Sequence, residues 1–290
     1  PVDYVLTGGD YDFLLLNLLA VLQTATGGAP DPTAFEPGIY WREDETIRNS
    51  GAFRLDHDLK SLPWIDRDLT QWQLYAEKNG NFRRTPGTYI MSGRDCWHGK
   101  CTFCSWTTLY PTYRARDPID VVDEIGELIE RYDVREIMDD TGSLPAGAWL
   151  KTFCEEMIAR GYHKRVRIDC NMRFGCLDEA AYRLMRKAGF RLVLFGLESA
   201  NQATLDRLVK ALTVSQIEEG ARLASRRRAH GRRAHGDPLQ RLRCALAAGA
   251  QGRLLRDRRQ LHRDGPRARR GDARLRDLSA VASVAARVPV

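Results

Sequence analysis

Three cysteines, Cys96, Cys101 and Cys104, lie within nine residues of one another in the stretch RDCWHGKCTFCSW at 94–106, with the spacing Cys-x4-Cys-x2-Cys. Thiolates grouped so closely are suited to binding metal. A closed zinc site needs four protein ligands, so zinc would require a fourth ligand from elsewhere in the chain. A 4Fe–4S cluster held by three thiolates leaves one iron open to a substrate-like ligand. The spacing favours the cluster, and zinc is the alternative.

Other residues could supply a fourth ligand, but each has a simpler role. His98 lies inside the motif and would need a strained loop to reach the same ion. Cys154 falls in the interior of a predicted helix, where a lone cysteine is usually a small core residue. Cys170 and Cys176 flank the end of a predicted strand and are nearer candidates. Packing is the favoured role for both of them.

The elements that must position the cysteines alternate regularly from residue 88 onward. Apolar patterns predict strands at 88–91, 134–138, 166–171 and 191–198 and helices at 117–132, 146–161, 177–189 and from about 201. Strands that alternate with one-faced helices through short loops indicate a parallel α/β sheet. Right-handed crossovers curl such a sheet toward a barrel. The predicted fold class is therefore α/β, a partial (β/α) barrel, truncated at its C-terminal side.

Polar groups follow several of these strands at the same end. The cysteine loop follows the strand at 88–91, MDDTG occupies 138–142 and GLES occupies 196–199. The carboxyl ends of parallel strands meet at one edge of a sheet, where ligands bind in this fold class. The sequence therefore predicts one functional face built from these three strand ends.

The start of the chain has a different pattern. VDYVLTG at 2–8 predicts a strand, and the apolar run at 12–22 predicts the helix after it. Residues 27–87 are rich in turn formers, which indicates an irregular connector. One short hairpin is expected within it, around GIYWREDETIRN.

The last seventy residues differ in composition from the rest. Residues 221–290 hold 19 Arg, 14 Ala and 5 Asp, with no Lys and no Glu, and no aromatic residue follows Phe195. This segment carries a net charge of +14, so the preceding 220 residues carry −7. Three interpretations are open: translation out of frame, a disordered tail, or a basic arm that contacts phosphates. The abrupt loss of Lys, Glu and aromatics favours the first, and we expect no nucleic-acid partner.

The number of cysteines and the hydropathy pattern indicate the cellular compartment of the protein. Seven cysteines with three clustered favour a metal site in a reducing compartment over a disulfide framework. The sequence contains no apolar run of eighteen or more residues, so we expect no membrane span, and we predict a cytoplasmic location.

Four stretches resemble the core of radical S-adenosylmethionine (SAM) enzymes, over about residues 88–219. They are CWHGKCTFC, YRARDPIDVVDEI, REIMDDT and GFRLVLFGLESANQATLDRLVK. More narrowly, they are similar to the branch that carries a cobalamin-binding domain in front of the barrel, and residues 1–70 are weakly similar to the end of that domain and its linker. The commonest family motif has three residues in its first gap, whereas this chain has four.

The resemblance implies a domain organisation. Residues 1–26 would be the C-terminal remnant of a Rossmann-like domain of the cobalamin-binding type, and 27–87 a linker. Residues 88–220 would be the radical SAM core, and 221–290 the tail described above.

The resemblance also implies roles for the cysteine loop. Cys96, Cys101 and Cys104 would each bind one iron of a 4Fe–4S cluster. The amino and carboxylate groups of SAM would occupy the fourth iron. Phe103, just before the last cysteine, would pack near the adenine.

Further cofactor-binding residues follow from the same resemblance. Asp139 and Asp140 would accept hydrogen bonds from the methionine amino group. Glu198 would contact the ribose hydroxyls, and a carboxylate can accept from both. Lys210 would pair with the methionine carboxylate, and Arg173 ends a predicted strand on the same face.

The reaction implied is the reductive cleavage of SAM to a 5′-deoxyadenosyl radical, with cobalamin-dependent methyl transfer to an unactivated carbon as its use. An electron donor such as flavodoxin or ferredoxin and a small-molecule or peptide substrate would be the partners. A cobalamin-independent radical SAM enzyme is one alternative, and a structural zinc-binding module or an inactive fragment is another.

Overall fold

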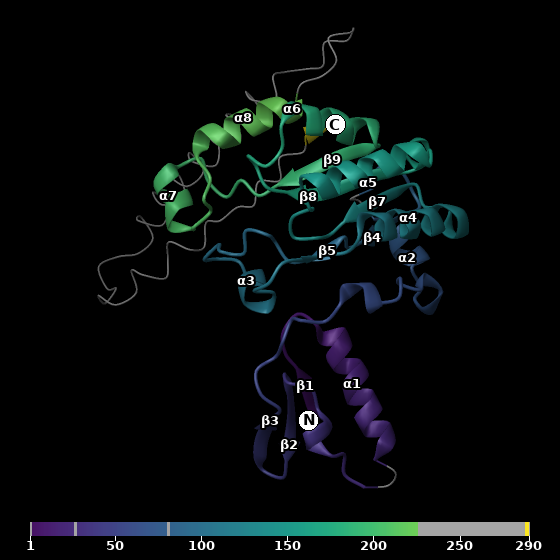
Figure 1. The fold of residues 1–290 in the computed structure, drawn as a ribbon, viewed down its shortest axis with the longest axis vertical. Helices are drawn as coiled ribbons and strands as arrows, with labels where there is room; N and C mark the ends of the chain where they lie inside the picture. The colour runs from purple at the N-terminus through teal and green to yellow at the C-terminus, as the bar shows by residue number, and fades with distance from the viewer. Residues whose placement is uncertain (1, 26–27, 80–81, 226–287, 290) are drawn as a thin grey trace, which may run out of the picture.

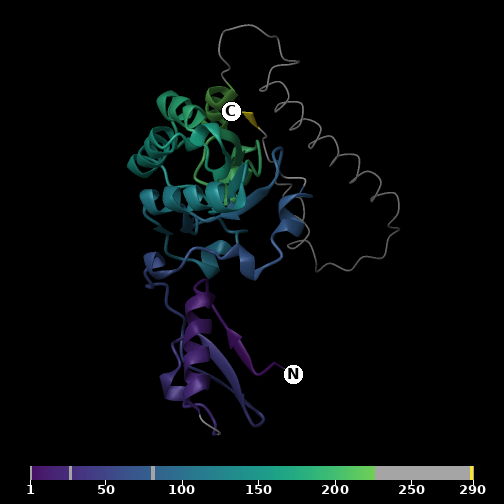
Figure 2. The ribbon, with the colours of Figure 1, turned by 90° about the vertical axis from the view of Figure 1, so that its right-hand side faces the viewer.

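The computed structural model describes residues 2–25, 28–79, 82–225 and 288–289, which form two lobes (Figures 1 and 2). The smaller, N-terminal lobe contains β1 (Tyr4–Leu6), α1 (Tyr11–Thr24), β2 (Ile39–Glu43) and β3 (Thr46–Asn49). Its strands form an antiparallel sheet in the order β1-β2-β3. Residues of α1 and β2 form its core, with Leu14, Leu18 and Ile39 all at most 6% exposed.

The predicted strand, helix and hairpin of this lobe are confirmed. The hairpin does not lie free in a connector, however, because β2 pairs with β1 and Tyr4 stands opposite Trp41. The unit expected at 1–26 therefore shares its sheet with residues as far as Asn49.

A segment with little regular structure connects the lobes. Its described residues contain only short helical turns, η2 (Leu59–Ser61), η3 (Arg67–Leu69) and α2 (Gln73–Ala76). Two similar turns lie outside this segment: η1 (Pro32–Ala34) follows α1, and η4 (Tyr162–Lys164) follows α5. The buried Arg67 guanidinium joins this segment to the larger lobe, since it donates to the Tyr89 carbonyl at 2.7 Å and the Thr88 hydroxyl at 3.0 Å.

The larger lobe is built on four parallel strands, as predicted. They are β4 (Gly87–Ile90), β7 (Glu136–Asp139), β8 (Arg167–Met172) and β9 (Phe190–Phe195), and the sheet order is β10-β9-β8-β7-β4. The helices α4 (Pro118–Tyr132), α5 (Ala148–Ala159) and α6 (Glu179–Lys187) lie side by side along one face of the sheet (Figure 1). This one-sided arrangement follows from crossovers of a single hand and is that of a partial (β/α) barrel.

Helix α4 shows how the local sequence specifies these elements. The Asp117 carboxylate caps the helix by accepting from the Ile119 N–H, and Pro118 takes the first helical position. The apolar residues predicted for one face are buried against the sheet, with Val121, Val122, Ile125, Leu128 and Ile129 each at most 2% exposed.

The end of the chain extends the sheet and the helical layer. Helix α7 (Gln202–Arg207) is followed by α8 (Val214–Ser225), in which Ala221 and Ala224 are buried in the main core. Helix α8 thus continues five residues beyond the boundary expected at 220, and the packed core continues to Ala224. Strand β10 (Val288–Pro289) pairs antiparallel with β9. The remaining expectations for the Arg-rich segment fall on residues 226–287 and 290, outside the described residues.

A small ribbon marks the functional end of the sheet. Strands β5 (Gly93–Arg94) and β6 (Arg114–Ala115) pair antiparallel, and the cysteine loop with α3 (Trp106–Leu109) lies between them. The ribbon therefore closes the base of the loop. Within the described chain, no helix has the length and apolarity needed to cross a bilayer.

The buried Asp10 carboxylate attaches the N-terminal lobe to this ribbon. Asp10 is 1% exposed and accepts two hydrogen bonds from Arg114, both at 2.7 Å, and one from Arg94 at 2.9 Å. His57 adds a fourth contact through Nδ1, at 2.9 Å. Burial by itself would raise the pKa of Asp10, but the bonds from Arg114, Arg94 and His57 outweigh it and lower the pKa to about 2.

We expect Asp10→Asn to lower the free energy of unfolding by about 3–5 kcal/mol, because it leaves the Arg114 guanidinium without its carboxylate partner, while Arg94 keeps Asp12. Urea denaturation at pH 7 measures this. Asp56→Asn is the control, since Asp56 pairs with Arg54 at 3.9 Å on the open surface and should contribute less than about 1 kcal/mol.

The same pair of variants gives a pH test. A folded-state pKa below the ordinary value of 3.8 means that Asp10 stabilises the fold above that pH and loses its effect as the pH falls toward 2. Asp10→Asn should therefore flatten the decline of stability over this range. An unchanged decline would contradict the assigned role.

Candidate functional site

The cysteine loop is held in place by the turn that follows α7. The Thr102 N–H donates to the Leu208 carbonyl at 3.1 Å, and His98 Nε2 donates to the Val209 carbonyl at 2.7 Å. That turn is strained, because Val209 and Ala211 have φ of 52° and 48°, a left-handed conformation that is rare for a β-branched residue. His98 is therefore engaged in fixing the loop.

The three thiols of the loop share one electrostatic environment. Cys101 is buried, while Cys96 and Cys104 are partly exposed. Burial raises the pKa of the Cys101 thiol, Lys210 and Arg173 oppose that rise, and Cys96 and Cys104 add to it. The thiols thus influence one another and face two cationic side chains, which is an arrangement suited to binding an anionic metal group.

The spacing of these side chains bears on the kind of metal group. Thiolates on one zinc ion lie about 3.8 Å apart at the usual Zn–S distance. In the part of the chain that the structure describes, no three His, Cys, Asp or Glu side chains converge closely enough to bind a single ion. In a 4Fe–4S cluster each thiolate binds a different iron, so the three need not meet at one ion. Three thiols beside two cationic side chains are a donor set that fits such a cluster.

Among the described residues, three cysteines lie outside the loop, and two of them are core residues. Cys154 and Cys170 are fully buried, and burial raises the pKa of the Cys154 thiol to about 12. Cys176 donates from its thiol to the Arg173 carbonyl at 2.9 Å. Packing therefore accounts for Cys154 and Cys170, as the sequence indicates.

Three of the predicted cofactor-binding residues come together beside the loop. Lys210 Nζ lies 3.1 Å from Glu198 Oε1, and these side chains are 9% and 7% exposed. The same ammonium lies 5.6 Å from the centre of the Phe103 ring. Glu198 has a left-handed φ of 58°, so its carboxylate is delivered by an unusual backbone turn at the end of β9.

Arg173 joins this group from the end of β8. Its guanidinium is almost buried and donates through Nη2 to the carbonyl oxygens of Lys210 and Ala211, the second at 3.2 Å. It also lies over Trp97, with Cζ 5.4 Å from the ring centre. Arg173 therefore contacts both the cysteine loop and the turn that holds it.

The two neighbouring aspartates have different surroundings. Asp139 is 1% exposed and accepts from the backbone N–H groups of Ser92 and Thr141, at 3.3 and 3.0 Å, and from the Ser92 hydroxyl. Burial raises the pKa of Asp139 despite these bonds. Asp140 is exposed beside Asn171. Asp139 is thus internally engaged, while Asp140 is open to a ligand.

Two buried polar side chains near the loop were missed from the sequence. Both carboxylate oxygens of Asp95 and the hydroxyl of Tyr113 lack hydrogen-bond partners within the described residues. Burial raises the pKa of Asp95 to about 7 against the opposing charges of Arg114 and Arg94. Its position directly before Cys96 is the one signal that could have identified it.

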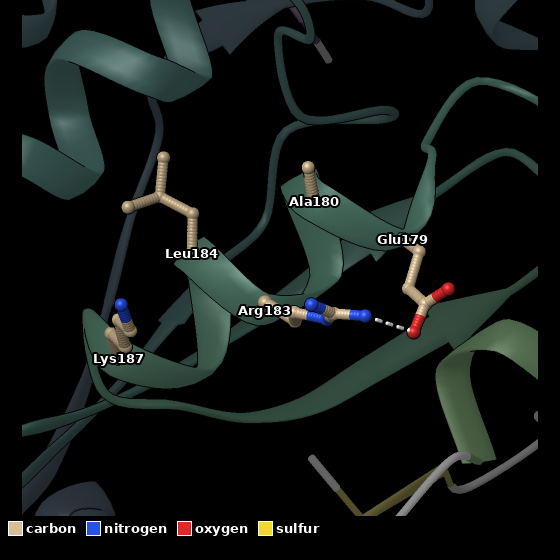
Figure 3. Close-up of a pocket in the computed structure, with 5 residues that line it drawn as sticks. All are labelled: Glu179, Ala180, Arg183, Leu184 and Lys187. Atoms are coloured by element: carbon tan, nitrogen blue, oxygen red, sulfur yellow. Dashed lines mark hydrogen bonds and ion pairs between the residues drawn. The ribbon is translucent and has the colours of Figure 1, made fainter.

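A shallow groove runs along the outer side of α6, lined by Glu179, Ala180, Arg183, Leu184 and Lys187 (Figure 3). Two of its three charged side chains face each other, since Arg183 donates to Glu179. None of the residues predicted for the site lines it, so the groove is separate from the cysteine loop.

We expect Asp139→Ala and Asp140→Ala to differ sharply in stability. Asp139→Ala leaves two buried N–H groups unpaired and should lower the free energy of unfolding by at least about 2 kcal/mol. Asp140→Ala removes an exposed side chain and should change it by less than about 0.5 kcal/mol. Urea denaturation of both variants measures the difference, and equal losses would contradict the assignment.

The chain is similar in sequence to known proteins over the region that contains this site. Residues 90–231 match the model of the Radical SAM superfamily. The anaerobic magnesium-protoporphyrin IX monomethyl ester cyclase of Cereibacter sphaeroides is 36% identical over 127 residues, which cover 42% of this chain and 21% of that protein. An uncharacterized methyltransferase of Pyrococcus horikoshii, PH0819, is 24% identical over 194 residues, covering 65% and 40%.

Two solved structures resemble about three quarters of the chain in fold. The radical SAM methyltransferase TsrM of Kitasatospora setae, solved with cobalamin and a 4Fe–4S cluster bound, has a TM-score of 0.58 and 17% identity, covering 77% of this chain and 44% of that one. The cobalamin-dependent radical enzyme OxsB has a TM-score of 0.55 and 16% identity, covering 72% and 30%.

The chain spans less than half the length of each of these proteins. The radical SAM resemblance found in the sequence is confirmed. Such a domain is the part of an enzyme that binds a 4Fe–4S cluster and SAM. Residues 90–231 carry a domain of the radical SAM superfamily, in a fold shared with cobalamin-dependent members of that superfamily.

Proposed function

We propose that this chain belongs to an enzyme that cleaves SAM reductively at the cysteine loop. The observation that carries the proposal is that two buried cations lie against the three-cysteine loop, Lys210 over Phe103 and Arg173 over Trp97, inside the radical SAM domain. Cys96, Cys101 and Cys104 would bind the cluster and leave one iron for the amino and carboxylate groups of SAM.

When bound, the cluster and SAM supply a 5′-deoxyadenosyl radical, because one electron delivered to the sulfonium breaks a carbon–sulfur bond and releases methionine. The protein supplies position and exclusion of water. An electron donor such as flavodoxin or ferredoxin must provide the electron, and a reducing compartment such as the cytoplasm suits free thiols.

The described side chains would hold SAM through opposite charges. Lys210 would pair with the methionine carboxylate, and Glu198 would accept from the ribose hydroxyls. The Lys210–Glu198 ion pair holds both side chains beside the loop, where SAM would replace it as their partner. Asp140 is the exposed acceptor for the amino group, whereas Asp139 keeps its structural bonds. Phe103, at 39% exposure, offers a ring to the adenine.

The proposed use of the radical chemistry is cobalamin-dependent methyl transfer to an unactivated carbon of a small molecule or peptide. The similarity in fold to TsrM and OxsB supports this, since it extends over 72–77% of the chain. The N-terminal lobe would then be the end of a cobalamin-binding domain, docked by Asp10 on the ribbon that frames the cysteines. The cyclase relative favours a second candidate, a different radical reaction on a tetrapyrrole-like substrate.

Anaerobic reconstitution of the chain should load about four irons, with matching sulfide. Alanine at Cys96, Cys101 or Cys104 should abolish this loading, because each thiolate binds its own iron. Cys154→Ala is the matched control, since that thiol lies in the core, and it should load fully. Iron and sulfide analysis measures the outcome. Zinc in place of iron, or full loading of Cys101→Ala, would refute the ligand assignment.

Lys210→Met should weaken SAM binding to the reconstituted protein by about 10- to 150-fold. This corresponds to the loss of a charge-assisted hydrogen bond of about 1.5–3 kcal/mol. Lys151→Met is the control, because Lys151 is an exposed helix residue paired with Glu155 at 3.8 Å. Anaerobic equilibrium dialysis measures both affinities, and an unchanged affinity for Lys210→Met would remove this residue from the site.

A further inference from the structure

Arg173 is a buried cation that lacks a counter-anion. Its side chain is 7% exposed, yet within the described residues no carboxylate pairs with it and its Nε has no hydrogen-bond partner. The contacts that it does make are to two carbonyl oxygens and to the face of Trp97. All three are neutral groups.

A buried guanidinium of this kind is costly by itself. Moving a charge out of water costs several kcal/mol unless a paired anion compensates. The neighbouring Lys210 does not share this problem, since Glu198 neutralises it at 3.1 Å. Carbonyl dipoles and a ring face offset part of the cost at Arg173, but no carboxylate among the described residues neutralises its charge. An anion bound beside Arg173 would therefore stabilise the site.

The groups that stabilise the charge on Arg173 identify where that anion belongs. Burial lowers the pKa of Arg173, and the groups that oppose this are the thiols of Cys101, Cys96 and Cys176. Two of these are proposed cluster ligands. Trp97, on which the guanidinium lies, directly follows Cys96. Arg173 and Lys210 thus both stand beside the cysteine loop, but Lys210 is paired with the Glu198 carboxylate, whereas no carboxylate among the described residues pairs with Arg173.

We propose that Arg173 is the counter-cation of the iron–sulfur cluster and raises its reduction potential. This inference rests on the proposed function. The reduced cluster carries one more negative charge than the oxidised one, so a fixed positive charge nearby stabilises the reduced form more. Net charge and hydrogen bonds to the sulfurs are the known protein controls on such potentials. Arg173 is a positioning and tuning residue, since it acts through the cluster.

The test is an anaerobic potentiometric titration of the reconstituted cluster, followed by electron paramagnetic resonance in the absence of SAM. At a fixed potential near the wild-type midpoint, Arg173→Gln should lower the ratio of reduced to oxidised cluster about tenfold. This is a midpoint shift of about 59 mV for one electron. Arg173→Met is a second neutral variant, which carries the test if the first does not fold. Arg173→Lys keeps the charge and should stay within about threefold of wild type.

Arg183→Gln is the matched control, because Arg183 is an exposed residue of α6 paired with Glu179, and it should not change the potential. An unchanged midpoint in the neutral variants, together with lost affinity for SAM, would overturn the inference and assign Arg173 to the ligand carboxylate. A midpoint that falls equally in Arg173→Lys would also overturn it. Failure of the wild type to assemble any cluster would refute the proposed function itself, which is a distinct result.

Discussion

The buried carboxylate of Asp139 determines where the cysteine loop leaves the sheet. It stands at the end of β7 and accepts from Ser92, just after β4, and from Thr141. The Gly93 N–H in turn donates to the Thr141 hydroxyl at 3.0 Å. Two neighbouring strand ends are thereby joined at a site where an unpaired donor would cost about 1–3 kcal/mol. The loop begins from this fixed point, so the placement of its thiols depends on it.

The other side of the loop depends on a strained turn. The left-handed residues Val209 and Ala211 direct their carbonyl groups toward the loop and toward Arg173, where His98 and the guanidinium bind them. Such conformations cost about 1–3 kcal/mol each and persist only where neighbouring contacts enforce them. The strained turn contains Lys210 and places its ammonium group between Glu198 and the ring of Phe103 in the loop. Backbone strain, charge placement and thiol position are therefore parts of one arrangement.

The charges of the site are divided unequally between its two cations. The Glu198 carboxylate neutralises Lys210. The negative charge that stabilises Arg173 comes from the cysteine thiols when they are ionised. At the base of the loop the charges are paired, because Arg94 and Arg114 both donate to the Asp10 carboxylate. The N-terminal lobe thus meets the ribbon through compensated charge, while the loop retains a positive excess. This contrast supports the proposal that the cysteine loop, and not the lobe junction, binds an anionic cofactor.

Local patterns in the sequence determined the elements and the likeness to radical SAM enzymes. The Asp117–Pro118 cap, the one-faced apolar helices and the short strands predict the parallel sheet because such signals act over a few residues. The cysteine spacing predicts the metal-binding loop for the same reason. Tertiary structure decided that Asp139 is engaged while Asp140 is open, and that Lys210 meets Phe103 across more than a hundred residues. It also decided that Arg173 has no carboxylate beside it among the described residues. These outcomes depend on strand register and on how distant turns pack together, and no local pattern encodes either of them.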